Sequence, residues 1–196
     1  MPRKAPMLEL TFPISWELFA KIEQAVRKAG YAKAIEWSED MKPPATAVKF
    51  ATEAIYVICN SGMSNRVAVP IFERSLAALK RGESASTVFG HKDKAAAIDN
   101  IWRNRASLFR ELHQAEDRIA FCAELPWIGP ITKYHLAKNL GADVAKPDVH
   151  LIRLAGPEGV TPQELCQRLA NATGYRVATI DLILWRACAD GIIHSR

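Results

Sequence analysis

The chain turns sharply at Leu125-Pro126-Trp127-Ile128-Gly129-Pro130-Ile131-Thr132, the stretch that decides its predicted fold. A short helical pattern precedes this stretch, from about Asp117 to Glu124, and another follows it as far as Gly141. Two helices joined by a tight turn are therefore expected. Unpaired amide N–H groups at the start of the second helix can bind a phosphate, and a glycine lets a ligand approach the backbone closely. An ordinary corner between two packed helices has the same pattern.

Helical patterning recurs along the rest of the chain, and strand patterning is scarce. Ser15 is a candidate cap for a helix that Gly30 would end, and Thr161-Pro162-Gln163-Glu164 has capping-box spacing. Other apolar periodicities predict helices over about 43–61, 65–81, 92–115 and 175–189. The sequence therefore predicts an all-α protein.

The 196 residues are enough for one compact domain or for two small lobes that share a cleft. No apolar run approaches the roughly 20 residues of a membrane span. The first residues, 1–6, lack the apolar core of a signal peptide. We therefore expect a soluble cytoplasmic protein with no membrane partner.

The charged residues favour a polyanionic partner. The net charge is +5, and the surplus lies in residues 1–110, which hold 17 Lys and Arg against 11 Asp and Glu. The four cysteines lie far apart, without the clustered spacing of a zinc site or an iron–sulfur cluster. We therefore expect neither a metal nor another cofactor, and buried reduced thiols.

A second motif follows the expected hairpin at Val144-Ala145-Lys146-Pro147-Asp148-Val149-His150, before an apolar helical pattern resumes. Together, residues 117–155 resemble the helix-hairpin-helix, Gly/Pro–Asp superfamily of DNA glycosylases, which includes endonuclease III and the alkylpurine glycosylases. The family hairpin has the form L-P-G-h-G, and a Gly/Pro-rich segment leads to an Asp that is often followed by x-His. The separation between the two motifs also fits.

The resemblance implies a two-lobed all-α fold with a DNA-binding cleft between the lobes. Lobe A would comprise about 1–40 and 145–196, and lobe B about 41–144 with the hairpin at 125–129. The implied protein is a monomer that binds double-stranded DNA containing a damaged or modified base, extrudes that base and cleaves its N-glycosidic bond, leaving an abasic site.

Three departures from the family pattern refine this expectation. Trp127 stands where the first hairpin glycine is usual, so it alters the turn and adds a stacking or packing surface. Ile131 stands where the members with lyase activity carry a Schiff-base lysine, and Lys133 would point about 200° away around the helix. The C-terminal cysteine cluster of the endonuclease III branch is absent. The resemblance therefore implies a monofunctional enzyme without an iron–sulfur cluster, unless Lys146 reaches the site.

By the same resemblance, Asp148 is the catalytic carboxylate, which stabilises positive charge on the sugar and orients or deprotonates the attacking water. An Asp before an apolar helical run is also a normal N-cap, and one residue can serve both purposes. Lys146 either contacts phosphate or is solvated, and His150 either supports Asp148 or fills core space.

The expected DNA contacts come from the hairpin and from a loop at a helix end. The hairpin residues are Trp127, Ile128, Gly129, Ile131, Thr132 and Lys133, with Lys146 further along. In the loop near Gly62, Asn60 or Met63 is the candidate side chain to fill the gap left by the extruded base. A simple helix stop at Gly62 is the alternative.

Two other functions remain open. A DNA-binding module that kept the hairpin and lost its chemistry would also explain Trp127 and Ile131. A glycosylase that removes a bulky modified base from phage DNA, in defence, would explain the unusual hairpin and the missing branch features. The sequence does not reveal the target base, because the shape of the pocket sets it.

Overall fold

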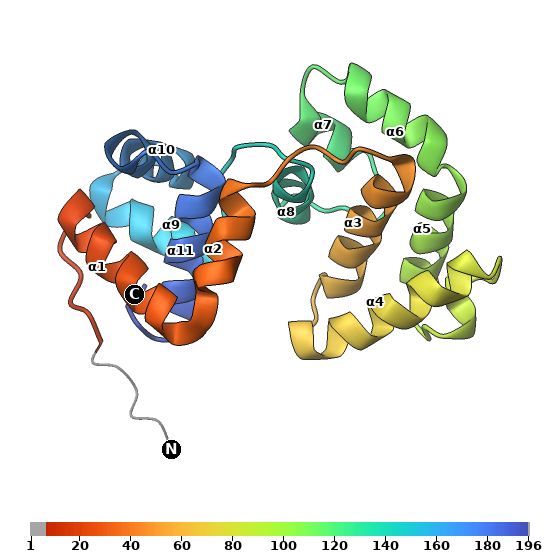
Figure 1. Cartoon of the computed structure of the whole chain (residues 1–196), viewed down its shortest axis with the longest axis horizontal. Coiled ribbons are helices and arrows are strands. Elements are labelled where there is room, and N and C mark those ends of the chain that lie inside the picture. The colour runs from red at the N-terminus through yellow and green to blue at the C-terminus, as the bar shows by residue number, and fades with distance from the viewer. Residues whose placement is uncertain (1–6, 196) are drawn as a thin grey trace. The chain divides into compact units, whose positions relative to one another are not determined.

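The fold was determined as a computed structural model that describes residues 7–195 (Figure 1). Within these residues every regular element is helical and no strand is present, which confirms the all-α prediction. No helix in the same residues is long and apolar enough to cross a membrane. The N-terminal stretch examined for a signal peptide, residues 1–6, lies outside the described part of the chain.

The chain divides into two compact units. The first comprises the described residues of Met1–Met41 and Asp143–Arg196, so it is built from both ends of the sequence. The second comprises Lys42–Ala142, and it contains the predicted hairpin. We call them the terminal unit and the central unit.

The central unit is built around α3 (Ala47–Asn60), whose buried side chains include Phe50, Ile55 and Ile58. Helices α4, α5, α6 and α8 all contact α3, and α7 packs on α8 (Figure 1). An apolar helix surrounded by amphipathic ones buries most of its surface, which is the main stabilising term in such a bundle. The elements around α3 are α4 (Asn65–Lys80), η2 (Ala85–Thr87), α5 (Lys92–Arg103), α6 (Arg105–Gln114), α7 (Arg118–Ala123) and α8 (Thr132–Asn139).

The terminal unit is built in the same way around α11 (Val177–Ala189), which α1, α2, α9 and α10 contact (Figure 1). Its core includes Phe19, Ile22, Leu151 and Leu184. The elements around α11 are α1 (Trp16–Val26), η1 (Arg27–Tyr31), α2 (Ala32–Glu39), α9 (Val149–Ala155), η3 (Gly156–Glu158) and α10 (Pro162–Thr173).

The predicted caps are present, and one predicted helix is wrong. Ser15 caps α1, and Thr161 and Glu164 form the capping box of α10. Gly30 ends the first helical stretch as predicted: it takes a non-helical φ of 101° at the kink inside η1, and α2 follows directly. The helix expected over 92–115 is broken at Asn104 into α5 and α6.

Candidate functional site

The predicted hairpin is present in the central unit, where α7 and α8 pack on each other. Trp127 lies in the turn between them and has a φ of 65°. Among residues 7–195 it is the only residue other than glycine with a positive φ. An L-residue in this conformation is strained, and glycine is the usual occupant. Trp127 therefore holds a backbone conformation that glycine adopts more readily.

The hydrogen bonds of the turn show which amides can bind a ligand. The N–H of Ile128 donates to the Leu125 carbonyl (3.1 Å), and the N–H of Gly129 donates to the Thr132 hydroxyl (2.8 Å). The amides of Ile131 and Thr132 are left without an acceptor among residues 7–195. Amides that can bind an anion are therefore present at the N-cap and the first residue of α8, and Thr132 holds Gly129 in place.

The side chains of the turn divide into buried and exposed ones. Ile128 is buried, whereas Trp127 and Ile131 are 40% and 39% exposed. The Trp127 ring packs edge-on against His91, with ring centroids 5.1 Å apart. The Lys133 ammonium lies over the ring of Tyr134, 5.4 Å from its centroid. The turn thus presents two apolar side chains beside unpaired amides.

A pair of substitutions tests the strained conformation of Trp127. Trp127→Gly and Trp127→Ala both remove the contact with His91, but only glycine adopts positive φ without strain. We expect Trp127→Gly to be more stable than Trp127→Ala by about 1 kcal/mol in urea denaturation. Equal stabilities of the two variants would show that residue 127 is not left-handed.

The Asp148 carboxylate lies in the terminal unit and is held by the start of α9. Its Oδ1 accepts hydrogen bonds from the amides of His150 (3.0 Å) and Leu151 (3.1 Å), so Asp148 is the N-cap. Its Oδ2 lies 3.6 Å from the Lys146 ammonium, and its side chain is 12% exposed. One oxygen therefore fixes the carboxylate, and the other pairs with a lysine whose side chain is 26% exposed.

Two side chains from other helices fix the segment before Asp148. Gln163 at the start of α10 accepts from the amide of Ala145 (2.8 Å), and Asp181 on α11 accepts from the amide of Lys146 (3.3 Å). Asp181 is only 2% exposed. Sequence analysis missed both residues. A lone Asp in the largely apolar helix 177–189 is the signal that could have found Asp181, because a buried carboxylate needs partners.

His150 is half-buried, and its Nδ1 lies 2.9 Å from the hydroxyl of Ser195. Its side chain therefore contacts the C-terminal segment. The Ser195 hydroxyl also bonds the thiol of Cys188, whose pKa is raised chiefly by burial. His150 acts on Asp148 through its backbone amide, as part of the cap.

The loop after α3 contains the two candidate wedge residues. Asn60 is the last residue of α3, Gly62 has a φ of 69°, and the Met63 amide donates to the Asn60 carbonyl (3.2 Å). Asn60 and Met63 are both half-buried. The helix stop at Gly62 is therefore present, and the two candidate side chains lie on either side of it. We call residues 60–63 the α3 loop.

The structure places the predicted residues in two groups. The hairpin residues and the α3 loop belong to the central unit, and Lys146 and Asp148 belong to the terminal unit. The central unit holds 14 Lys and Arg against 9 Asp and Glu, whereas the terminal unit holds 12 of each. The whole net charge of +5 therefore lies in the unit with the hairpin.

The cysteines offer no reactive thiolate. Cys59, Cys122 and Cys166 are buried, and Cys188 is partly exposed. Burial raises the pKa of Cys59 to about 11 and that of Cys122 to about 12, so both thiols are protonated at neutral pH. Within residues 7–195, no three side chains of the His, Cys, Asp or Glu type gather as a metal site would require.

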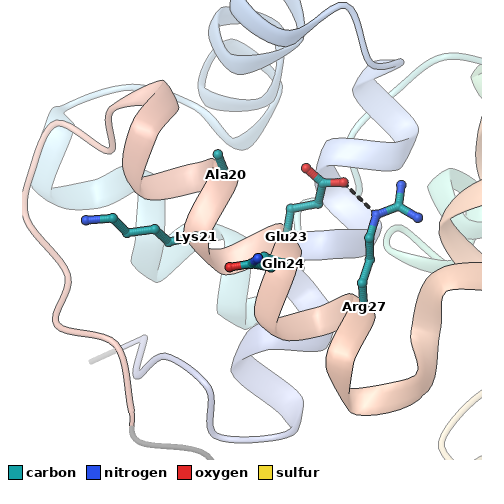
Figure 2. A pocket seen from close by; sticks show the side chains of 5 residues that line it. All are labelled: Ala20, Lys21, Glu23, Gln24 and Arg27. Carbon is teal, nitrogen blue, oxygen red and sulfur yellow. Dashed lines mark hydrogen bonds and ion pairs between the residues drawn. The ribbon is translucent and has the colours of Figure 1, made fainter.

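A shallow pocket lies along α1, away from the predicted residues in the sequence (Figure 2). Its lining residues are Ala20, Lys21, Glu23, Gln24 and Arg27. Figure 2 shows the Arg27 guanidinium bonded to Glu23. The Arg27 nitrogen and the Glu23 oxygen lie 2.7 Å apart, and both side chains also bond the Tyr175 hydroxyl. Because Glu23 and Arg27 already bond each other and Tyr175, we assign no ligand to this pocket.

No protein-family model, curated protein or solved structure matches this chain. The assignment of a function therefore depends on the geometry of the residues themselves.

Proposed function

We propose that the protein is a monofunctional DNA N-glycosylase that extrudes a damaged or modified base and hydrolyses its bond to the sugar. The observation that carries this proposal is the Asp148 carboxylate. It is fixed through Oδ1 by two backbone amides, its Oδ2 lies 3.6 Å from the Lys146 ammonium, and in the sequence it follows a hairpin that has unpaired amides.

The proposed chemistry needs one carboxylate and one water. The C1′–N bond breaks, and its electron pair leaves with the base, so positive charge develops on the sugar. The negative charge of Asp148 stabilises that sugar, and water adds to C1′ while it loses its proton to Asp148. Ile131 replaces the family's Schiff-base lysine, and Lys133 lies over Tyr134. We therefore propose that no covalent adduct with the sugar forms.

We propose that the hairpin holds the DNA backbone. The unpaired amides of Ile131 and Thr132 are suited to one phosphate, and the helix dipole of α8 favours a negative ligand at this end. The exposed side chains of Trp127 and Ile131 would contact the sugars beside that phosphate. Contacts of this type position a duplex without reading its sequence, in keeping with the positive charge of the central unit.

The salt dependence of DNA binding tests the position of this contact. Lys133→Gln should reduce the slope of log K against log salt by about 0.9, because one fewer counterion is released from the duplex. Lys21→Gln removes the same charge from an exposed position on α1 in the terminal unit and should leave the slope unchanged. Equal reductions in the two variants would show that binding depends on total charge and not on the hairpin.

The activity itself is tested by incubating the protein with duplexes that carry a panel of lesions and modified bases, phage-type modifications included. We expect one class of base to be released, as identified by mass spectrometry, and alkali-labile abasic sites to remain without added metal. Borohydride should trap no protein–DNA adduct. Release of no base by a protein that binds these duplexes would favour the second candidate, a non-catalytic DNA-binding module. That candidate is supported by the capping role of Asp148, which explains the residue without chemistry.

A further inference from the structure

Lys94 is a buried cation in the first turn of α5. Its side chain is almost fully enclosed, with 4% of the residue exposed, and its ammonium donates a hydrogen bond to the backbone carbonyl of Ser61 in the α3 loop. No carboxylate within residues 7–195 forms an ion pair with Lys94. A charge that is buried without a counter-ion is costly, so its location requires a physical explanation.

The end of α3 supplies the compensation. Ser61 is the C-cap of this 14-residue helix, so its carbonyl lies at the negative end of the helix dipole, where a cation is stabilised. Burial lowers the pKa of Lys94, and the neighbouring thiol of Cys59 is kept neutral by its own raised pKa. The ammonium therefore binds a backbone carbonyl at the end of α3, where the last carbonyls of a helix lack helical partners.

The same turn of α5 also contacts the hairpin. The amide of Lys94 donates to Nδ1 of His91 (3.4 Å), which caps α5, and the His91 ring packs edge-on against Trp127. A continuous series of contacts thus joins Trp127 in the hairpin, through His91 and Lys94, to Ser61 in the α3 loop. All four residues belong to the central unit.

We propose that Lys94 is a positioning residue that fixes the α3 loop relative to the hairpin, so that Asn60 or Met63 can enter the gap left by an extruded base. The inference rests on the proposed function, because it assigns that task to the loop. In the proposed complex, Lys94 contacts neither phosphate nor base. Removal of the Lys94 ammonium should therefore leave the binding of the duplex intact and weaken the entry of Asn60 or Met63 into the gap. Without Lys94, the α3 loop would have to become ordered as the side chain enters, and that ordering costs free energy.

The test compares Lys94→Met with Lys92→Met. Both variants lose one ammonium from the same turn of α5, but Lys92 is exposed and has no role in the proposed site. The probe is a duplex with one tetrahydrofuran abasic analogue and a 2-aminopurine beside it, whose fluorescence rises when the base unstacks. For Lys94→Met we expect the unstacking equilibrium to fall about tenfold, the cost of ordering roughly one residue, with affinity and salt slope within about twofold of wild type. Lys92→Met should unstack the probe as the wild type does.

Hydrogen exchange of the peptide that covers residues 60–64, measured without DNA, provides a second readout. The amides of this peptide should lose protection in Lys94→Met and keep it in Lys92→Met. If Lys94→Met does not fold, Lys94→Gln, whose amide is too short to reach the same carbonyl, is measured in both assays. Wild-type unstacking and unchanged protection in a folded Lys94 variant would overturn the inference. Failure of the wild type to bind or unstack the probe would instead overturn the proposed function, whatever the exchange results.

Discussion

Asp148→Asn is expected to lower the rate of base release by about 10²–10⁴-fold, while DNA affinity changes little. The substitution removes the negative charge that would stabilise the sugar and accept the proton from water. It keeps the size of the side chain, and its amide oxygen can still accept the hydrogen bonds from His150 and Leu151. Single-turnover kinetics on the base identified by the lesion panel would measure the effect.

The choice of Asn separates the chemistry of Asp148 from its role as a cap. Asn and Asp are comparable N-caps, so we expect the free energy of unfolding to change by less than about 1 kcal/mol. Asp117→Asn is the matched control, because Asp117 caps α7 with the same pair of bonds, to the amides of Ile119 and Ala120. That control should keep full activity. Base release by Asp148→Asn at the wild-type rate would refute the assigned mechanism.

Gly141→Ala is expected to destabilise the protein by about 2–4 kcal/mol, from strained backbone and overpacking together. Gly141 follows α8 with a φ of +89°, and an added Cβ would lie 2.7 Å from the backbone nitrogen of Pro43 and 3.0 Å from the carbonyl carbon of Lys42. Both neighbours are main chain, which cannot rotate away as a flexible side chain can. Urea denaturation would show the loss as a lower midpoint with an unchanged slope.

Gly82→Ala isolates the steric part of this effect. Gly82 has a similar φ of +83°, but an added Cβ would meet no atom within 4 Å. It should therefore cost only the strain of positive φ, about 1–2 kcal/mol. Equal stabilities of Gly82→Ala and Gly141→Ala would show that Gly141 does not lie against the backbone of Lys42 and Pro43.

Much of the fold follows from local sequence signals. Ser15, Thr161 and Glu164 cap their helices as predicted, because a cap depends on side chains within three residues of the helix start. Gly30 forms the kink between α1 and α2 because glycine adopts positive φ readily, but the sequence did not show that a second helix begins directly after it. Ile35 and Ser38 of the following helix are buried, and α2 packs on α11, a long-range contact that local patterning does not contain.

In the candidate site, too, local sequence signals predicted some features and long-range packing decided others. The sequence singled out Asp148 and the hairpin by their spacing, and it marked Trp127 as a departure from the glycine pattern. It did not indicate that Trp127 adopts positive φ, that Thr132 occupies the amide of Gly129, or that Asp181 holds the segment before Asp148. The bond to Asp181 joins residues 35 positions apart, so no short motif could show it.

The sequence by itself determined the helical class, the caps and the turn between α7 and α8, because each of these depends on residues within one or two helical turns of one another. Only the tertiary structure decided which polar groups are already bonded and which remain free to bind a ligand. Lys94 illustrates the reason: in the sequence it is one more lysine on an amphipathic helix, but packing places its ammonium against a carbonyl 33 residues away. Burial and partners are properties of the packed chain, and they are what distinguish a solvated charge from one that holds a site together.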